Sequence, residues 1–333
     1  MKALVTGGGG FLGGALVRRL VADGAEVRSL ARGDYPWLRE LGVDARRGDV
    51  ADAAAVRGAA RGCDVVFHVA AKAGVWGPRA EYVRANVEGT RNVLAACRAE
   101  GVPRLVHTST PSVVHDGGDQ DGVDESAPYA ARFLCPYPET KALAEREVLA
   151  ANGPGLATVA LRPHLVWGPR DTHLVPMLLD RARSGRLRRV GSRPCLVDTT
   201  YVENAVDAHL AAAARLAPGA ACAGRAYFVA NGEPLPVSEI IDRILAAGGL
   251  PPVSRRISAR GAFALGAVLE AAYRVLGRRD EPPMTRFVAR QLATAHWFRL
   301  DAARRDLGWE PRVTIAEGLE RLAAWLRAEG LAR

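Results

Sequence analysis

Lysine is almost absent from this 333-residue sequence, since Lys2, Lys72 and Lys141 are the only lysines among its 45 Lys and Arg residues. The arginines that supply the net charge of +9 stand singly or in pairs, with no basic block and no interleaved aromatic residues. Nucleic-acid-binding domains concentrate basic charge on one face or segment, so we expect no nucleic-acid partner. The charge suits a solvated surface, or in part a site for an anionic cofactor and an acidic substrate.

The five cysteines are scattered and form no Cys-x-x-Cys pair. Closely spaced cysteines are the usual sign of a structural metal site, so we expect reduced thiols and no metal. No run of about 18 apolar residues occurs, although a membrane-spanning helix needs that length. The chain also begins without the apolar stretch of a signal peptide. We therefore expect a cytoplasmic protein with no transmembrane segment.

Short apolar runs alternate with amphipathic stretches in the first half of the sequence. Strands are predicted near residues 4–5, 26–30, 64–67, 104–107 and 156–161, with helices at 11–22, 82–100 and 138–151. This alternation predicts an α/β fold with a Rossmann-type, doubly wound parallel sheet covered by helices on both faces. We place the Rossmann domain at residues 1–163 and a smaller, mostly helical substrate domain at 164–333. A helix at 201–214 and a strand at 225–230, within about 196–230, are expected to return to the main sheet.

A glycine-rich turn joins the first predicted strand to the first predicted helix. Gly7, Gly10 and Gly13 have the spacing GxxGxxG, and Phe11 and Leu12 lie between the last two. One glycine allows the tight turn, the next lets backbone N–H groups approach a pyrophosphate, and the third lets the helix pack on the strand. The helix N-terminus adds unpaired N–H groups and partial positive charge. The turn therefore predicts a dinucleotide site.

The end of the second predicted strand indicates which dinucleotide is bound. An NAD enzyme usually places a carboxylate there to bind the adenosine ribose, whereas this sequence has Leu30-Ala31-Arg32-Gly33. Arg32 is suited to clamp a 2′-phosphate through charge-assisted hydrogen bonds, so NADP(H) is favoured. Arg28 is a candidate second cation, and Asp34 leaves NAD as the alternative.

Tyr137 and Lys141 lie four residues apart, which in a helix puts both on one face. A free phenol, with a pKa near 10, is a poor acid or base at neutral pH. A nearby ammonium and an oxidised nicotinamide favour the phenolate and lower that pKa. With so few tyrosines and lysines, this spacing is expected about 0.06 times by chance. The pair favours a redox enzyme over a dinucleotide-sensing regulatory protein, which would not need it.

A third functional group is expected after the strand at 104–107. A hydroxyl there could hydrogen-bond a substrate carbonyl and stabilise its developing negative charge. Ser109, Thr110 and Ser112 are all candidates by spacing. His68 and His107 lie in buried strands and are interpreted as core histidines.

Together these stretches resemble the extended short-chain dehydrogenase/reductase family over nearly the whole chain. The resemblance implies Thr110 as the central hydroxyl, where serine is more usual, Tyr137 as acid/base and Lys141 as its partner. It also implies that a helix residue, Asn86, supports the site. Further cofactor contacts are implied for Asp49, Val50, Ala70, Ala71, Lys72, Asn86 and Pro163.

Segments 70–77, 108–113, 197–201 and 231–236 resemble the 3β-hydroxysteroid dehydrogenase-like branch, and within it the bacterial 2-alkyl-3-oxoalkanoate reductases of long-chain olefin biosynthesis. The resemblance implies NADPH-dependent reduction of the 3-keto group of a 2-alkyl-3-oxo acid. It also implies partner enzymes that lactonise and decarboxylate the product, and a homodimer. A 3β-hydroxysteroid dehydrogenase, or another ketone or alcohol oxidoreductase, is the alternative.

A β-keto acid carries a carboxylate beside its reacting carbonyl, so a cation near the pocket would orient it. Lys72 is the first candidate for this cation, with Arg170 and Arg193 as alternatives. Ser112 and His164 are the other predicted substrate contacts. The nearly all-apolar stretch 262–273 is expected to pack in the core; the alternatives are that it covers alkyl chains or touches a partner or a membrane surface.

Overall fold

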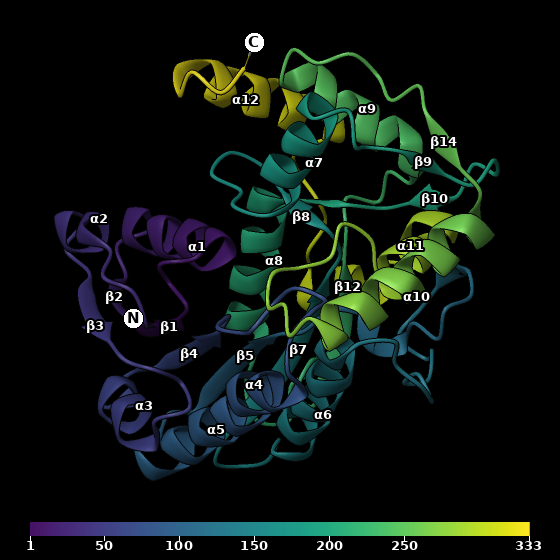
Figure 1. Ribbon diagram of the computed structural model, residues 1–333. Coiled ribbons are helices and arrows are strands. Elements are labelled where there is room, and N and C mark those ends of the chain that lie inside the picture. The colour runs from purple at the N-terminus through teal and green to yellow at the C-terminus, as the bar shows by residue number, and fades with distance from the viewer. Residues whose placement is uncertain (333) are drawn as a thin grey trace.

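The computed structural model describes residues 1–332 and contains a seven-stranded parallel sheet in the order β12-β7-β5-β4-β1-β2-β3 (Figure 1). The sheet confirms the predicted doubly wound architecture. Its strands are β1 (Lys2–Thr6), β2 (Glu26–Ala31), β3 (Asp44–Arg47), β4 (Val65–His68), β5 (Arg104–Thr108), β7 (Ala157–Pro163) and β12 (Arg225–Val229).

Helices cover both faces of this sheet. Along β1, Ala3 and Val5 enter one apolar core and Leu4 enters the other, because successive side chains of a strand point to opposite faces. Burial on both faces explains why the strands are apolar almost without interruption. The first core is closed by α1 (Phe11–Ala22) and α8 (Val202–Arg215), and the second by α3 (Ala53–Ala60), α5 (Gly89–Ala99) and α6 (Pro136–Ala150).

The helix predicted over residues 82–100 is interrupted. A short helix α4 (Arg79–Tyr82) runs into a π-helical turn, η1 (Val83–Glu88), before α5 begins. Wide turns of this kind occur mostly inside α-helices and often at functional sites. This one carries Asn86.

The seventh strand comes from the second half of the chain. β12 pairs in parallel with β7 along its whole length, from Arg225 opposite Val159 to Val229 opposite Pro163. The helix before it, α8, packs against α1, and Arg19 of α1 lies 2.7 Å from Asp207 of α8. Residues 202–229 therefore complete the main sheet and its cover.

The rest of the second half is mostly helical and lies beyond the carboxyl edge of the sheet (Figure 1). Trp167 and Tyr201 are fully buried in a third core between these helices. The helices are α7 (Leu174–Arg183), α9 (Val237–Ala247), α10 (Ala259–Val275), α11 (Arg286–Ala293) and α12 (Ile315–Ala328). Short strands link them, among them β9 (Arg189–Val190), β10 (Leu196–Val197), β14 (Arg256–Ile257) and β15 (His296–Phe298).

Helix α10 departs from the sequence-based expectation. Only Ala262, Gly266 and Glu270 of this helix are buried, while Leu265 and Val268 are exposed. The prediction that residues 262–273 pack in the core is therefore wrong for most of the stretch, because the helix touches the body of the protein along one narrow side. Within residues 1–332, no helix has both the length and the hydrophobicity to cross a bilayer.

A buried ion pair fixes α6 to the sheet. Glu145 of α6 accepts hydrogen bonds from Arg162 of β7 at 2.6 and 3.0 Å, and from the hydroxyl of Tyr129 at 2.7 Å. The side chains of Glu145 and Arg162 are 0% and 4% exposed. The guanidinium and the hydrogen bonds hold the pKa of Glu145 below its usual value in spite of burial. Removal of one partner would leave the other charge buried and unpaired.

Arg162→Met should therefore lower the free energy of unfolding by about 3–5 kcal/mol, the usual cost of breaking a buried pair. Arg91→Met is the matched control, since Arg91 forms a similar bidentate pair with Glu147 on the exposed side of the same helix. The control should lose less than about 1 kcal/mol, because exposed pairs are screened by solvent. Urea unfolding of both variants measures the difference. Equal losses would show that the buried pair does not anchor α6.

Candidate functional site

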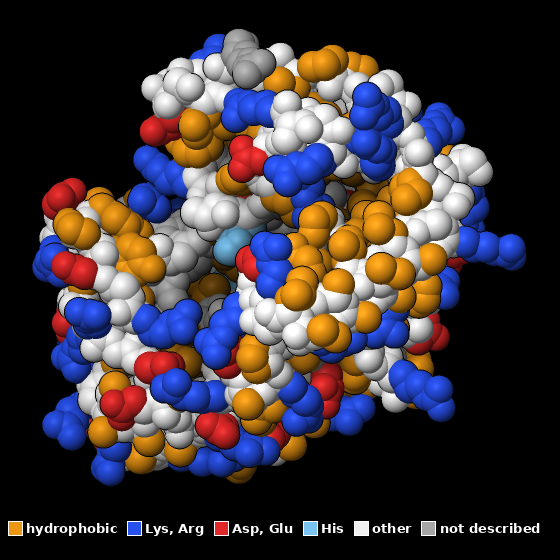
Figure 2. Space-filling model, in the orientation of Figure 1, with side chains coloured by type: hydrophobic (Ala, Val, Ile, Leu, Met, Phe, Trp, Pro, Cys, Tyr) orange, Lys and Arg blue, Asp and Glu red, His pale blue; other side chains and the backbone are white. Residues whose placement is uncertain are grey.

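A cleft of about 600 Å³ opens at the carboxyl edge of the main sheet. The surface is hollowed between the side formed by α1 and α2 (Pro36–Glu40) and the C-terminal helices (Figure 2). Most of the predicted cofactor residues line it: Gly7, Gly10, Phe11, Leu12, Gly13, Arg32, Asp49, Val50, Ala70, Ala71, Lys72, Tyr137 and Lys141. Sequence reasoning missed several other lining residues, among them Tyr35, Glu81, Arg84 and His173.

The glycine turn forms the floor of the cleft. Gly7 has φ +74°, and a Cβ there would lie 3.0 Å from the backbone N of Ala70. A Cβ at Gly13 would lie 2.2 Å from the carbonyl oxygen of Gly7. Both positions therefore require glycine. No side chain caps the start of α1 at Gly10, so its first N–H groups can bind a pyrophosphate, as the dinucleotide prediction requires.

Tyr35 explains Gly9, one of the two glycines of the turn that the GxxGxxG spacing does not require. Gly9 does not belong to the GxxGxxG triplet, yet a Cβ there would lie 2.1 Å from Cε2 of the Tyr35 ring. The aromatic ring therefore lies directly on the turn and forms part of the cleft wall. A run of four glycines, longer than the motif needs, was the one signal in the sequence for this contact.

Three charged residues are predicted near the adenosine ribose of the dinucleotide, and they lie in different places. Arg32 is exposed, lines the cleft and has no ion-pair partner among residues 1–332. Asp34 lies outside the lining and pairs with Arg39 at 2.7 Å. Arg28 does not reach the cleft: it is 6% exposed, and its Nε donates to Asp44 at 2.6 Å. The candidate role of Arg28 as a second phosphate-binding cation is therefore wrong.

Asn86 supports the cleft from behind and is not part of its lining. Its Oδ1 accepts from the backbone N–H of Lys72 at 2.7 Å, and its Nδ2 donates to the Lys72 carbonyl at 3.2 Å. Nδ2 also donates to the Thr140 hydroxyl at 3.0 Å. The π-helical turn thus ties the loop after β4 to α6. Pro163, the last residue of β7, is also buried outside the lining.

Tyr137 lies in the first turn of α6, one turn before Lys141, and both side chains line the cleft. Burial raises the pKa of Tyr137, and the nearby Thr110 hydroxyl, which favours the ionised phenol, opposes this shift only in part. The expectation of a lowered pKa therefore does not hold in the protein alone. A phenol that stays protonated at neutral pH is a proton donor.

Thr110 is the hydroxyl that the structure brings to Tyr137. It precedes the 3₁₀ turn η2 (Pro111–Val114), and its Oγ1 accepts from the Ser112 N–H at 3.2 Å. Ser109 lines the cleft, whereas Thr110 and Ser112 do not. Of the three hydroxyls left open by spacing, Thr110 is the one that affects the pKa of the phenol, and Ser109 is the one that lines the cleft.

Lys141 is 2% exposed, and its ammonium is held by the end of β5. Nζ donates to the Thr108 carbonyl at 2.6 Å and lies 3.2 Å from Nε2 of His107. Burial lowers the pKa of Lys141 to about 8, and the nearby Glu145 carboxylate opposes this shift. The lysine therefore titrates close to physiological pH.

The two buried histidines differ. His68 is bonded on both ring nitrogens, at 2.8 Å to the Thr6 hydroxyl and 3.0 Å to that of Thr90, and is a core histidine as expected. His107 is fully buried, and its pKa is lowered far below the usual value by burial, so it is neutral. Its Nε2 can then only accept from the ammonium of Lys141. No local sequence pattern indicates this contact, because it joins β5 to α6.

The predicted substrate residues are mostly not brought to the cleft. Lys72 lines it, but its Nζ pairs with Glu81 at 2.9 Å. His164 lies outside the lining, is 5% exposed and donates from Nδ1 to the Asp198 carbonyl at 2.6 Å. Arg170 is exposed, and it too lies outside the lining. The structure thus does not group His164, Arg170 and Ser112 around Tyr137.

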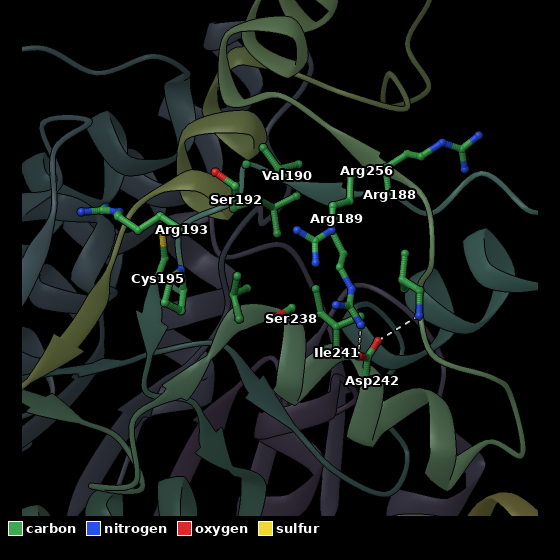
Figure 3. A pocket seen from close by; sticks show the side chains of 15 residues that line it. Arg188, Arg189, Val190, Ser192, Arg193, Cys195, Ser238, Ile241, Asp242 and Arg256 are labelled. Carbon is green, nitrogen blue, oxygen red and sulfur yellow. Dashed lines mark hydrogen bonds and ion pairs between the residues drawn. The ribbon is translucent and has the colours of Figure 1, made fainter.

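A separate cavity of about 220 Å³ lies between β9, β14 and α9 (Figure 3). Its arginines do not converge: Arg189 points toward Asp242, with which it pairs, while Arg193 points to the opposite side (Figure 3). Arg193 pairs with Asp119. Neither Tyr137 nor Lys141 lines this cavity, so it is not the site of the proton-transfer residues, and Arg193 does not serve them.

Comparison with known proteins finds relatives over nearly the whole chain. The profile of the 3-beta hydroxysteroid dehydrogenase/isomerase family matches residues 4–256. A 2-alkyl-3-oxoalkanoate reductase of Stenotrophomonas maltophilia (strain K279a) is 55% identical over 97% of this chain and 99% of its own. One of Shewanella oneidensis is 50% identical over 97% of this chain and 86% of its own. The solved structure of MoeE5 in complex with UDP-glucuronic acid and NAD has a TM-score of 0.77 and 27% identity, covering 99% of this chain and 100% of that one.

Replacement of His107 should change the pH dependence of turnover. In His107→Leu the ammonium of Lys141 loses an acceptor, which disfavours its charged form. The alkaline limb of kcat/KM, which reports groups of the free enzyme, should move to lower pH by about one unit, since a hydrogen bond to a charge contributes about 1.5–3 kcal/mol. His107→Gln, which retains an acceptor, should stay closer to the wild type. Identical profiles for all three proteins would contradict the role of His107.

Proposed function

Because the chain belongs to the 3-beta hydroxysteroid dehydrogenase/isomerase family, we propose that it reduces the 3-keto group of a 2-alkyl-3-oxoalkanoic acid with NADPH, giving the 2-alkyl-3-hydroxy acid. The observation that carries the reaction type is the presence of Tyr137 and Lys141 in one cleft with the glycine turn. The relatives at 55% and 50% identity, both named 2-alkyl-3-oxoalkanoate reductase, support the substrate.

The cleft fits a dinucleotide. Backbone packs where Gly7 and Gly13 would carry side chains, so the turn can approach a pyrophosphate closely. Asp49 and Val50 line the cleft, as expected for the adenine end, and Asp49 is held by Arg84 at 3.0 Å. The exposed Arg32, which has no acidic partner within residues 1–332, supports a 2′-phosphate and hence NADPH. A bound reduced nicotinamide supplies a hydride for the carbonyl carbon.

The side chains of the chain supply the proton. Tyr137 donates its phenolic proton to the carbonyl oxygen as negative charge develops there. Thr110, whose hydroxyl lies near enough to the phenol to influence its pKa, would bind the same oxygen. The ammonium of Lys141 stabilises the phenolate that remains, until the phenolate recovers a proton from water. The raised pKa of Tyr137 suits reduction, because the proton donor is present at neutral pH.

A cation in the cleft would orient the carboxylate of the substrate. Lys72 is the candidate cation, since it lines the cleft; it would have to share its charge between the substrate and Glu81. A 2-alkyl-3-hydroxy acid has the hydroxyl and carboxylate in place for closure to a β-lactone and loss of CO₂. Lactone-forming and decarboxylating enzymes are the proposed downstream partners. A homodimer is the proposed assembly.

The test is NADPH oxidation with a panel of ketones, in which a 2-alkyl-3-keto acid should give the highest kcat/KM. A β-keto acid without the 2-alkyl branch, and a UDP-sugar, are the comparison substrates. A 3β-hydroxysterol with NAD tests the alternative activity. Turnover of the sterol without turnover of any β-keto acid would overturn the proposed substrate and leave the oxidoreductase chemistry standing.

Arg32→Ser should change the preference between the two cofactors. Loss of the cation should raise the KM for NADPH by at least about tenfold, since a charge-assisted hydrogen bond contributes about 1.5–3 kcal/mol. The KM for NADH should change little. Arg39→Ser is the control, because Arg39 pairs with Asp34 outside the cleft. An unchanged ratio of the two KM values in Arg32→Ser would show that Arg32 does not bind the 2′-phosphate.

A further inference from the structure

Helix α10 presents an apolar stripe to solvent. Leu265, Val268, Val275 and Leu276 are 43%, 66%, 87% and 69% exposed. Their spacing puts them on one side of the helix and its last turn, and this set is called the α10 stripe below. Apolar side chains gather over α10 on the face shown in Figure 2. Large exposed apolar residues elsewhere, such as Leu41, stand alone, and single ones need no explanation.

The stripe is held outward by the way α10 is attached. Gly266 lies on the opposite side of the helix, where a Cβ would lie 2.6 Å from the backbone of Thr285. Glu270, on the same side, accepts hydrogen bonds from the Arg286 backbone N–H at 2.7 Å and from its Nε at 2.9 Å. These contacts fix α10 to the start of α11. The stripe therefore cannot turn inward without breaking a close backbone contact and a buried ion pair.

Positive charge surrounds the stripe. Among the residues of α10 and the four that follow it, 259–279, the only acid is Glu270, which is buried and paired with Arg274 and Arg286. Five exposed arginines in and around α10 form no ion pair within the described part of the chain: Arg255, Arg256, Arg260, Arg279 and Arg290. An apolar helix side flanked by arginines is the pattern of a helix that lies in a membrane interface.

We propose that α10 docks the protein on an anionic lipid surface, with the α10 stripe among the acyl chains and the surrounding arginines at the headgroup phosphates. Burial of the stripe contributes through the hydrophobic effect, and each arginine near an anionic leaflet adds electrostatic attraction. The docking is peripheral, since α10 has 17 residues with charged groups along it. This inference does not depend on the proposed substrate.

The same charges argue against a second copy of the chain as the occupant. A two-fold interface pairs a patch with itself, so Arg260 and its neighbours would meet the same arginines of the other copy. Like charges facing each other at an interface cost several kcal/mol. The stripe is also the convex side of a helix, which suits a lipid surface better than an inserted peptide.

The C-terminal end of α10 lies near the start of α6, the helix that carries Tyr137. A cavity of about 440 Å³ lies between Tyr273 and Arg274 of α10 and the segment Cys135–Pro136, which directly precedes Tyr137. Trp76 also lines it, with its ring edge-on to that of Tyr273 at 6.1 Å. If the proposed function holds, an alkyl chain leaving the lipid surface at this end of α10 enters a cavity beside the proton donor.

Vesicle cosedimentation tests the docking with the full chain. The protein should bind phosphatidylcholine vesicles that contain 30% phosphatidylglycerol, bind pure phosphatidylcholine vesicles weakly, and dissociate as salt is raised. Val268→Gln/Val275→Gln should weaken binding at least tenfold, and Arg260→Gln/Arg279→Gln should reduce the salt dependence. The control is Leu41→Gln/Leu331→Gln, which changes exposed apolar residues elsewhere and should bind like the wild type.

Reduction of a short-chain, water-soluble keto acid separates this inference from the proposed function. The Val268→Gln/Val275→Gln variant should keep the wild-type rate on that substrate, because neither residue lines the cleft or the cavity. Wild-type rates with weakened vesicle binding support the docking. Absence of binding to anionic vesicles at low salt, or equal binding by this variant, overturns it. So does a dimer, detected by light scattering, that the same substitutions dissociate.

Discussion

The buried ion pair between Glu145 and Arg162 is the contact on which the site depends. Glu145 follows Lys141 by one turn of α6 and Tyr137 by two, so the three side chains share one side of the helix. The bidentate bond to β7 fixes the rotation of that helix against the sheet. With the rotation fixed, the phenol reaches Thr110 and the ammonium reaches the end of β5. The proposed proton-transfer groups, Tyr137 and Lys141, are thus positioned by a contact that lies outside the cleft.

The same arrangement makes the protonation state of Lys141 depend on the groups around it. Its ammonium is buried, which is costly unless acceptors surround it. The Thr108 carbonyl and the neutral ring of His107 supply them, and Glu145, one helical turn away, provides negative charge. The result is a lysine whose pKa is about 8 beside a tyrosine whose pKa is raised. At neutral pH the site therefore holds a protonated phenol and a protonated amine. The proposed carbonyl reduction starts from this protonation state.

The sequence predicts those parts of the site that lie in local patterns. The glycine turn, the Tyr137–Lys141 spacing and the strand-to-turn hydroxyls each occupy a few consecutive residues, and α1 begins and ends where the periodicity placed it, at Phe11 and Ala22. The parallel, doubly wound arrangement of the sheet follows from strands that alternate with helices. These features are set by backbone geometry and helix periodicity, which are readable without knowing the tertiary contacts.

Contacts between elements that lie far apart along the chain could not be predicted from the sequence. Tyr35, in the loop after β2, packs on Gly9. His107 of β5 accepts a hydrogen bond from Lys141 of α6. Arg28 has the right spacing for a phosphate but is bound by Asp44 below the sheet edge. The stretch 262–273 has a core-like composition, yet only one side of α10 finds a neighbour. In each case packing decided between alternatives that composition and spacing left open.

The most direct measurement of the central claim compares turnover and cofactor affinity in Tyr137→Phe. If the phenol is the proton donor in the cleft, kcat should fall by about 10²–10⁴-fold, the usual contribution of general acid catalysis. The dissociation constant for NADPH, followed by fluorescence, should stay nearly unchanged, because the glycine turn and Arg32 are intact. A Tyr137→Phe protein that binds NADPH and turns over at the wild-type rate would contradict the account.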